Sequence, residues 1–268
     1  MFSDKIGGSL MNYTDVLVER IDSVGIVTLN RPEHYNTFNV TMAEQLNSAL
    51  SELENDSLIR VVIVKAAGKN FCAGIDVRDI EGMPNVQYLE WVELMEQMSV
   101  TISSMGKPVI ASVHNVAIAN GIGLVAACDL AVASENARFG ATAINVGLFC
   151  MGPAVPLSRS LGRKRALELL LTGDMIDAYE AERIGLINKV VSNDSLDEET
   201  MKMALKLASK SPLALQLGKK SFYKMEDLSF KEALHLSNCN FANLCTTEDA
   251  HEGVEAFLKK RHPQWKMK

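Results

Sequence analysis

Short apolar runs of strand length alternate with stretches of helical periodicity along the first half of the chain. Residues 60–66, 108–113 and 129–133 form apolar runs that predict buried strands. Residues 41–55 and 86–105 lie between these runs, and their apolar side chains recur at spacings of three and four, which predicts amphipathic helices. This order predicts a layered α/β core in which helices cross over a sheet.

The N-terminal part of the chain adds a hairpin and a helix start to this prediction. Residues 15–21 and 25–30 are rich in β-branched side chains and predict a hairpin. Thr41 lies three residues before Glu44, which predicts a capping box at the start of the helix that follows.

The chain from about Pro153 onward is predicted to be almost entirely helical. Asp177 is a candidate N-cap, and Gly185 is a candidate stop for the helix between them. The helices are expected at residues 153–161, 163–171, 178–184, 195–209, 212–225, 229–245 and 247–261. We therefore expect an α/β core over residues 1–190 and a helical region over residues 191–268.

Composition excludes some classes of function. The 268 residues include 47% hydrophobic side chains and carry a net charge of −6, which argues against a nucleic-acid partner. Five cysteines, with no C-x-x-C pair, predict reduced thiols and a cytoplasmic protein without a secretory signal. Val109 to Cys128 is long enough to span a membrane, but its polar residues and glycines favour a buried strand followed by a buried helix, so no membrane span is expected.

Two segments carry the residues expected to do chemistry. Lys69–Asp79 (KNFCAGIDVRD) and Lys107–Asp129 (KPVIASVHNVAIANGIGLVAACD) each predict a strand, a glycine turn and a helix. The first N–H groups of a helix have no partner within it and point outward. Two such turns that face each other can hold one developing oxyanion between two N–H groups.

The order of these motifs along the chain resembles that of a known family. F-C-A-G-x-D is followed by K-P-V-I-A-x-V and then by a glycine turn that ends in C-D-L-A-V-A. Further matches begin at Leu29-Asn30-Arg31-Pro32 and end at Lys260-Arg261. The chain is thereby similar to the crotonase family, the enoyl-CoA hydratase/isomerase superfamily, over nearly its whole length.

The resemblance implies a fold and a class of substrate. The implied fold is an α/β spiral of repeated ββα units with a C-terminal helical trimerisation region. The implied substrate is an acyl-CoA thioester, processed by a lyase or isomerase of fatty acid metabolism, with no metal or further cofactor. The implied partner is a second copy of the chain, in a homotrimer or a dimer of trimers.

The resemblance also implies roles for particular residues. The backbone N–H groups of Ile75 and Asn120 would form the oxyanion hole, although the family usually has glycine where this chain has Asn120. Residues flanking the pantetheine and adenine would be His34, Ala73, Gly74 and Asp76. The CoA phosphates would contact Arg78 and Lys260, the latter from the helical tail of the same or a neighbouring subunit.

The chain departs from the pattern of the family's hydratases. Those enzymes use two glutamates on one water, and the corresponding positions here are Gly123 and Ala143. A third position, an aspartate in some isomerases and dehalogenases, is Met151. Residues 145–150 are similar to those of a subgroup of enoyl-CoA hydratase domain-containing proteins that also lack both glutamates. Ordinary hydration is therefore not expected.

Other side chains are candidates for the missing acid–base group. Cys150 lies near the expected substrate end, but its nucleophilicity depends on its pKa. Asn145 could orient a water or carboxylate, and His114 follows a predicted strand; Asp76 is instead expected to cap a helix. Four glutamates lie in or beside the helix that often covers the acyl pocket in this family, and most are expected to face water: Glu81, Glu90, Glu93 and Glu96.

Two hypotheses from different classes stay open. The first is an enzyme that processes acyl-CoA with non-standard residues, by isomerisation, decarboxylation, hydration of a ring acyl group or thioester hydrolysis. The second is a non-catalytic or regulatory protein that holds an acyl-CoA without chemistry.

Overall fold

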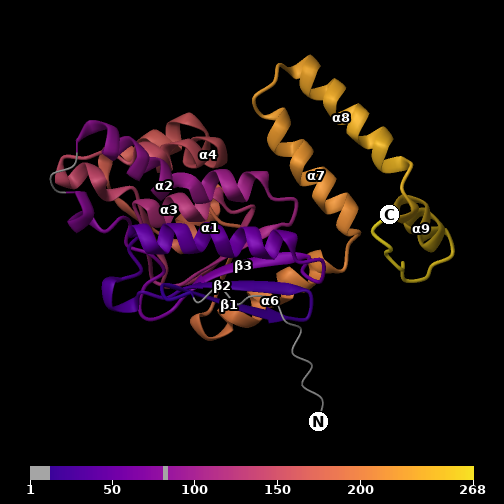
Figure 1. Ribbon diagram of the computed structural model, residues 1–268, viewed down its shortest axis with the longest axis horizontal. Helices are drawn as coiled ribbons and strands as arrows, with labels where there is room; N and C mark the ends of the chain where they lie inside the picture. The colour runs from indigo at the N-terminus through magenta and orange to yellow at the C-terminus, as the bar shows by residue number, and fades with distance from the viewer. Residues whose placement is uncertain (1–12, 81–83) are drawn as a thin grey trace, which may run out of the picture.

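A six-stranded sheet forms the centre of the molecule, in the order β1-β2-β3-β4-β6-β9. The computed structural model describes residues 13–80 and 84–268 (Figure 1). The first pair of strands is the predicted hairpin, and all other neighbours run parallel. The strands are β1 (Val16–Ile21), β2 (Val24–Leu29), β3 (Val61–Ala66), β4 (Val109–Val113), β6 (Leu130–Ser134) and β9 (Lys189–Val191).

A second, three-stranded sheet of short strands was not predicted. It has the order β5-β7-β8, formed by β5 (Val116–Ile118), β7 (Arg138–Gly140) and β8 (Met175–Asp177). β5 directly follows β4, and β7 follows β6, so the chain contributes to the large sheet, then to the small sheet, and returns through a helix. This repeated strand–strand–helix path winds the core into a spiral.

Helices cover both faces of the large sheet. One face is covered by α1 (Val40–Asn55), α2 (Asn85–Ser104), α3 (Asn120–Ala127) and α4 (Met151–Thr172), and the other by α6 (Leu196–Ala208). Alternate residues of β3 enter the two cores: Val62 and Val64 face the first group of helices, whereas Val61 and Ile63 face α6. Strands buried on both faces explain why their sequences are continuous apolar runs.

Two of the predicted helix-capping residues are confirmed by the structure, and one is not. Asp177 caps α5 (Ala178–Ile184) by accepting a hydrogen bond from the N–H of Glu180, and Gly185 ends that helix in the left-handed region, as predicted. The prediction of Thr41 as an N-cap is wrong. Asn39 caps α1 instead, because its side-chain oxygen accepts the Met42 N–H at 2.8 Å.

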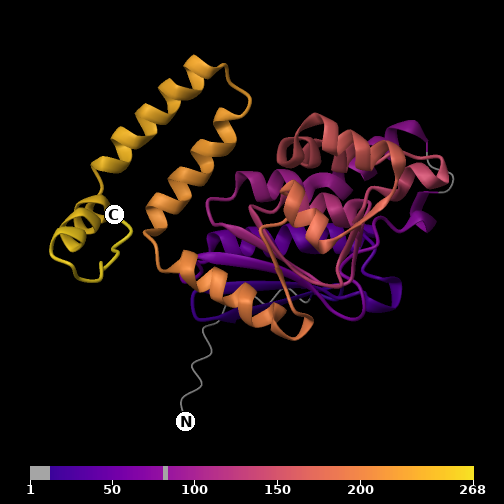
Figure 2. The same ribbon diagram turned by 180° about the vertical axis from the view of Figure 1, so that it is seen from behind.

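The last three helices form an arm that extends away from the sheet (Figures 1 and 2). They are α7 (Pro212–Met225), α8 (Phe230–Cys245) and α9 (Glu248–Leu258). A buried ionic contact ties α7 to the core, since Asp129 forms an ion pair with Lys219 at 2.7 Å and accepts a hydrogen bond from the Tyr223 hydroxyl at 2.9 Å. α6 packs on the sheet, so the arm begins at α7.

The arm exposes large apolar side chains within this chain. No residue of α8 is buried, and the exposed fractions of Phe230, Phe241 and Phe257 are 86%, 68% and 81%. Beside the contacts of Asp129 with α7, a cavity of about 760 Å³ lies between α7 and the core. Among the described residues, no helix is long and apolar enough to cross a membrane.

Candidate active site

The two predicted glycine turns lie against each other in the structure. A Cβ built on Gly74 would lie 2.8 Å from the Cβ of Ala119 and 3.7 Å from the backbone nitrogen of Asn120. A parallel bridge between Cys72 and Ala117 holds the segments in this register. Residues more than 40 positions apart in the chain are thereby brought into one site.

Both turns present free N–H groups. Ile75 pairs with Phe38 in a parallel bridge, but the bonds of that bridge involve the Gly74 carbonyl and the Asp76 N–H, so the Ile75 N–H points to the other side. Asn120 is the first residue of α3, where the N–H lacks a partner within the helix. Neither N–H donates a hydrogen bond to any residue that the structure describes. Two free donors on touching turns can stabilise an oxyanion.

The residue before Asn120 adopts a strained backbone. Ala119 has φ 50° and ψ −117°, a conformation that L side chains rarely adopt. Such a residue costs about 1–3 kcal/mol and persists only where its surroundings impose it, often at functional sites. Here the strained residue lies at the contact between the start of α3 and the Gly74 turn.

Glu96 is the acidic side chain that turns inward from α2. Its Oε1 accepts a hydrogen bond from the side-chain Nδ2 of Asn120 at 2.8 Å, and its carboxyl group packs on Gly152 at the start of α4. Burial raises the pKa of Glu96 to about 7, against a smaller opposing effect of the Asn120 hydrogen bond. A carboxyl group of this pKa both accepts and donates protons near neutral pH.

The sequence indicated Glu96 only as one of four candidate glutamates for the acid–base group. Glu90 and Glu93 are exposed, whereas Glu96 is half-buried. Glu81 lies outside the described residues. The spacing offers one signal that would have selected Glu96, because it follows the buried Trp91 and Met95 and precedes the buried Met98 on the inner face of the helix.

The two positions that carry glutamates in the hydratases have no carboxylate here, and their surroundings differ. A Cβ on Gly123 would lie 3.0 Å from the Cβ of Pro153, so the α4 helix fills the place of a side chain there. Ala143 is half-buried and Met151 is exposed. A glutamate introduced at position 123 would therefore have to displace Pro153.

Cys150 interacts with both Glu96 and Ala143. Burial raises its pKa, with smaller effects from a backbone hydrogen bond of Ala143 and from the charge of Glu96. A raised pKa keeps the thiol protonated near neutral pH, and the thiolate is the nucleophilic form. The geometry thus favours Cys150 as packing beside the carboxyl group of Glu96.

Two further predicted side chains bind backbone carbonyls. The Nδ2 of Asn145 donates to the Gly173 carbonyl at 3.2 Å, just after the end of α4. A hydrogen bond of 3.0 Å joins Nε2 of His114 to the Gly68 carbonyl, and burial lowers the pKa of His114. Through these hydrogen bonds, both side chains support loops of the fold.

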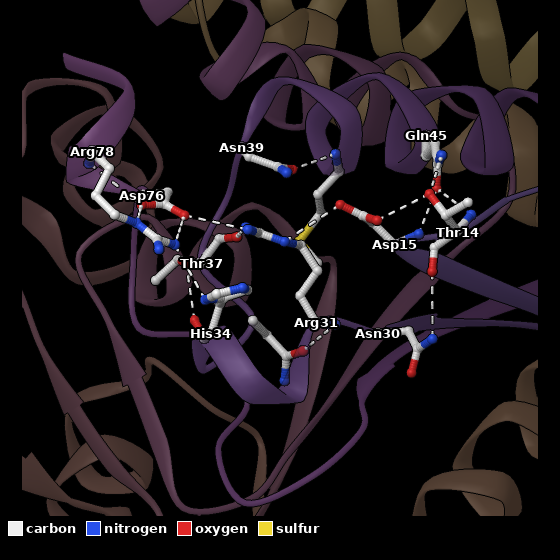
Figure 3. A network of polar contacts seen from close by, with 12 residues as sticks. Thr14, Asp15, Asn30, Arg31, His34, Thr37, Asn39, Gln45, Asp76 and Arg78 are labelled. Atoms are coloured by element: carbon white, nitrogen blue, oxygen red, sulfur yellow. Dashed lines mark hydrogen bonds and ion pairs between the residues drawn. The ribbon is translucent and has the colours of Figure 1, made fainter. Parts of the chain in front are cut away.

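A network of charged side chains supports the turn that carries Ile75 (Figure 3). Asp76 accepts hydrogen bonds from Arg78 at 2.6 and 2.8 Å and from the buried Arg31 at 3.3 Å. Arg31 also contacts Asp15 at 3.4 Å, and Arg78 donates to Nδ1 of His34 at 3.1 Å. These arginines hold the pKa of Asp76 well below its usual range, with the Arg78 hydrogen bonds the largest cause.

Replacing Asp76 with asparagine is expected to lower the free energy of unfolding by about 2 kcal/mol, because hydrogen bonds to a charged group are lost beside the buried Arg31. The stability that Asp76 contributes is present above the ordinary aspartate pKa of about 3.9 and is lost as pH falls toward its depressed folded value. Urea unfolding at pH 7 and at pH 3 measures both effects.

The variant should therefore differ most from the wild type at pH 7 and least at pH 3. A matched control is Asp197→Asn, which removes an ion pair of an exposed carboxylate with Lys65 and should cost less than about 1 kcal/mol. Equal losses for the two variants would contradict the support assigned to Asp76.

The remaining predicted coenzyme contacts lie in two places. Ala73 is half-buried, and its N–H donates to the Tyr35 carbonyl at 3.1 Å. Ala73 and Gly74 therefore lie beside the Asp76 network. Lys260 comes directly after the C-cap of α9, and α9 lies far from α3 and α4 in Figure 1. Among the residues described, no three His, Cys, Asp or Glu side chains gather to hold a metal ion.

Known proteins share both sequence and fold with this chain. The model of the family "Enoyl-CoA hydratase/isomerase" matches residues 19–268. The rat (Rattus norvegicus) "Enoyl-CoA hydratase domain-containing protein 3, mitochondrial" is 39% identical over 91% of this chain and 82% of its own length.

Solved structures agree with the predicted fold class. An enoyl-CoA hydratase of Mycobacterium smegmatis has a TM-score of 0.91 and 39% identity, covering 94% of this chain and 99% of that one. Human enoyl-CoA hydratase domain-containing protein 3 has a TM-score of 0.90 and 36% identity, covering 94% of this chain and all (100%) of that one. These likenesses confirm the α/β spiral with its helical tail.

Proposed function

The chain belongs to the enoyl-CoA hydratase/isomerase family, and we propose that it is an enzyme that stabilises the enolate of an acyl-CoA thioester. The observation that supports this proposal is the pair of free N–H groups, of Ile75 and Asn120, on two touching turns. A thioester oxygen placed between them would accept two hydrogen bonds as its negative charge develops. Such preorganised donors are typically a major source of rate enhancement.

Coenzyme A would lie along the Asp76 network. Arg78 and His34 are close enough to each other to form a hydrogen bond, and the Arg78 side chain is 64% exposed. A guanidinium group at this position can bind a phosphate with two parallel hydrogen bonds. His34, Ala73, Gly74 and Asp76 would then border the pantetheine and adenine.

Ordinary hydration is not the activity that we propose. The two positions of the hydratase glutamates hold Gly123, which is packed on Pro153, and Ala143. A positioned acid–base group typically contributes about 10²–10⁴-fold to the rate of an enzyme. An enzyme that retains the oxyanion donors and lacks both of these carboxylates can stabilise an enolate, and we expect it to hydrate poorly.

We also propose that the arm joins copies of the chain in a homotrimer or a dimer of trimers. The exposed Phe230, Phe241 and Phe257 would become buried in such an assembly. Lys260 follows α9, which lies far from α3 and α4 of its own chain in Figure 1, so it would then be available to the coenzyme bound by a neighbouring subunit.

The proposed function is tested with 3-butenoyl-CoA, phenylacetyl-CoA and hexanoyl-CoA in D₂O. We expect calorimetry to detect binding of these thioesters, and mass spectrometry to detect deuterium entering C2 of at least one of them. We expect crotonyl-CoA hydration, followed by loss of the conjugated enoyl-thioester absorbance, to be slow or undetectable.

Three outcomes separate the alternatives. Absence of binding to every thioester would overturn the acyl-CoA site. Binding without exchange or turnover would favour the non-catalytic protein. Rapid hydration of crotonyl-CoA would show that other groups replace both missing glutamates.

A further inference from the structure

One residue joins the oxyanion site to a carboxyl group. The backbone N–H of Asn120 is one of the two free donors, and its side-chain Nδ2 donates to Glu96 at 2.8 Å. One asparagine side chain and one hydrogen bond therefore connect the Glu96 carboxyl group to the backbone N–H that is proposed to bind the thioester oxygen. The reacting carbon of an acyl-CoA is bonded to the thioester carbon, so it lies in the same small region.

Glu96 also reaches the neighbourhood of an empty hydratase position. Its charge acts on the thiol of Cys150, which in turn has a hydrogen bond with the backbone of Ala143. A hydratase of this family would carry a glutamate at position 143. In this chain a carboxyl group enters the same neighbourhood from α2 instead.

The other ionisable groups near the two turns have contacts or pKa shifts that make them unsuitable for proton exchange near neutral pH. Asp76 is bound by Arg78 and Arg31, and those contacts hold its pKa far below neutrality. The thiol of Cys150 has a raised pKa, and His114 is bound to the Gly68 carbonyl. Among the residues described here, Glu96 is the group beside Asn120 that can exchange a proton near neutral pH.

We propose that Glu96 is the acid–base residue of this site and moves a proton between two carbons of a bound 3-enoyl-CoA. The inference rests on the proposed enolate-stabilising function. One carboxyl group suffices for such a 1,3-proton shift, because the proton that it removes is the proton that it returns. The site therefore favours isomerisation of a double bond over hydration, which in this family uses two carboxylates on a water.

The step balances without a co-reactant. The Glu96 carboxylate bonds to a proton of C2, and the C2–H electron pair forms a C1–C2 double bond. The thioester oxygen takes the negative charge and accepts hydrogen bonds from the N–H groups of Ile75 and Asn120. The C3–C4 π pair then forms the new bond from C4 to the proton of the Glu96 carboxyl group. The C1–C2 π pair moves to C2–C3, and the oxyanion pair re-forms the carbonyl of a 2-enoyl-CoA.

Asn120 acts as a positioning residue for Glu96. The family usually has glycine at this position, which has no side chain to donate. Here the amide holds one carboxyl oxygen of Glu96 and favours the charged form, so it lowers the pKa that burial raises.

The groups that face Glu96 come from three elements. α3 contributes the uncharged Asn120, and the first turn of α4 contributes Gly152. The N-cap of α4 is Cys150, which contributes its protonated thiol. On α2 itself, Glu93 is exposed. No charged side chain among these residues holds the pKa of Glu96 down, so its titration should appear as one ionisation near pH 7.

The test follows conversion of 3-butenoyl-CoA to crotonyl-CoA by the rise of conjugated enoyl-thioester absorbance. Glu96→Gln keeps the shape and can still accept the Asn120 hydrogen bond, but it cannot take a proton. We expect its kcat to fall by about 10²–10⁴-fold. The affinity for 3-butenoyl-CoA, measured by calorimetry, should change less than about threefold, since the oxyanion donors stay in place.

Two control variants accompany it. Glu93→Gln on the same helix should leave kcat unchanged, because that side chain is exposed. Asn120→Ala keeps the backbone N–H and removes the amide that favours the charged carboxylate. It should therefore move the rise of kcat with pH, expected near pH 7 in the wild type, to higher pH.

The outcomes distinguish this inference from the proposed function. A Glu96→Gln variant that isomerises 3-butenoyl-CoA at the wild-type rate would overturn the role of Glu96 and leave the oxyanion site intact. A wild type that neither isomerises the probe nor exchanges C2 protons of any thioester would overturn both. A kcat profile that does not move in Asn120→Ala would overturn the positioning role.

Discussion

Replacement of Ile75 with proline is expected to lower kcat for the most active acyl-CoA by about 10²–10³-fold, which is the usual cost of losing one oxyanion donor. Proline has no backbone N–H. The Ile75 N–H is free in the structure and points away from the bridge with Phe38, so no hydrogen bond of the fold is lost. Proline is tolerated at extended positions whose N–H is outside the ladder.

The measurement is steady-state turnover beside thermal unfolding. Ile75→Val is the matched control, because it shortens the side chain but keeps the N–H, and it should retain kcat within a few-fold. The affinity for the acyl-CoA should change much less than kcat in both variants, since the developing charge exists mainly in the transition state. A folded Ile75→Pro variant with normal kcat would exclude Ile75 from the oxyanion hole.

Gly121→Ala is expected to destabilise the protein by about 3 kcal/mol or more and to abolish turnover, because the added methyl group meets backbone atoms that cannot rotate away. A Cβ at this position would lie 2.3 Å from the carbonyl oxygen of Cys72 and 3.0 Å from its carbonyl carbon. That carbonyl accepts the Ile118 N–H at 3.0 Å, so moving it would disturb the bridge that aligns the two turns.

Gly218→Ala provides the comparison for Gly121→Ala. Gly218 lies within α7, and nothing lies within 4 Å of a Cβ placed there. Alanine at an open helix position should add about 0.5–1 kcal/mol of stability. Thermal unfolding and turnover of both variants test the contrast, and a stable, active Gly121→Ala protein would contradict the close approach of α3 to Cys72.

Local patterns predicted most elements of the core. The apolar run at residues 60–66 became β3, and the periodic stretch at 86–105 became α2 at Asn85–Ser104. These elements follow local rules because a buried strand and an amphipathic helix each display their burial in the order of their side chains. Three-residue strands such as β5 and β7 carry too few side chains to show a period, so the small sheet was missed.

The caps show how a correct motif can fail locally. Thr41 and Glu44 have the spacing of a capping box, but Asn39 captures the Met42 N–H and starts the helix earlier. Two suitable side chains compete for one helix start, and the path of the preceding chain decides between them. Asp177 has no such competitor, and its predicted role holds.

The amino-acid sequence by itself determined the family, the spiral α/β fold and the absence of carboxylates at positions 123 and 143. These properties follow from the order and spacing of residues along the chain, so interatomic distances are not needed to recognise them. The resemblance to that family implied Ile75 and Asn120 as the oxyanion donors, and the structure places their turns in contact.

Only the tertiary structure separated Glu96 from the other glutamates around α2. The sequence places Glu90, Glu93 and Glu96 on one helix, but burial against Gly152 and the hydrogen bond from Asn120 are contacts with α4 and α3. The cost of burying a charge, which raises the pKa of Glu96 to about 7, depends on those neighbours. Acid–base chemistry at this site is therefore a property of three helices meeting at one carboxyl group.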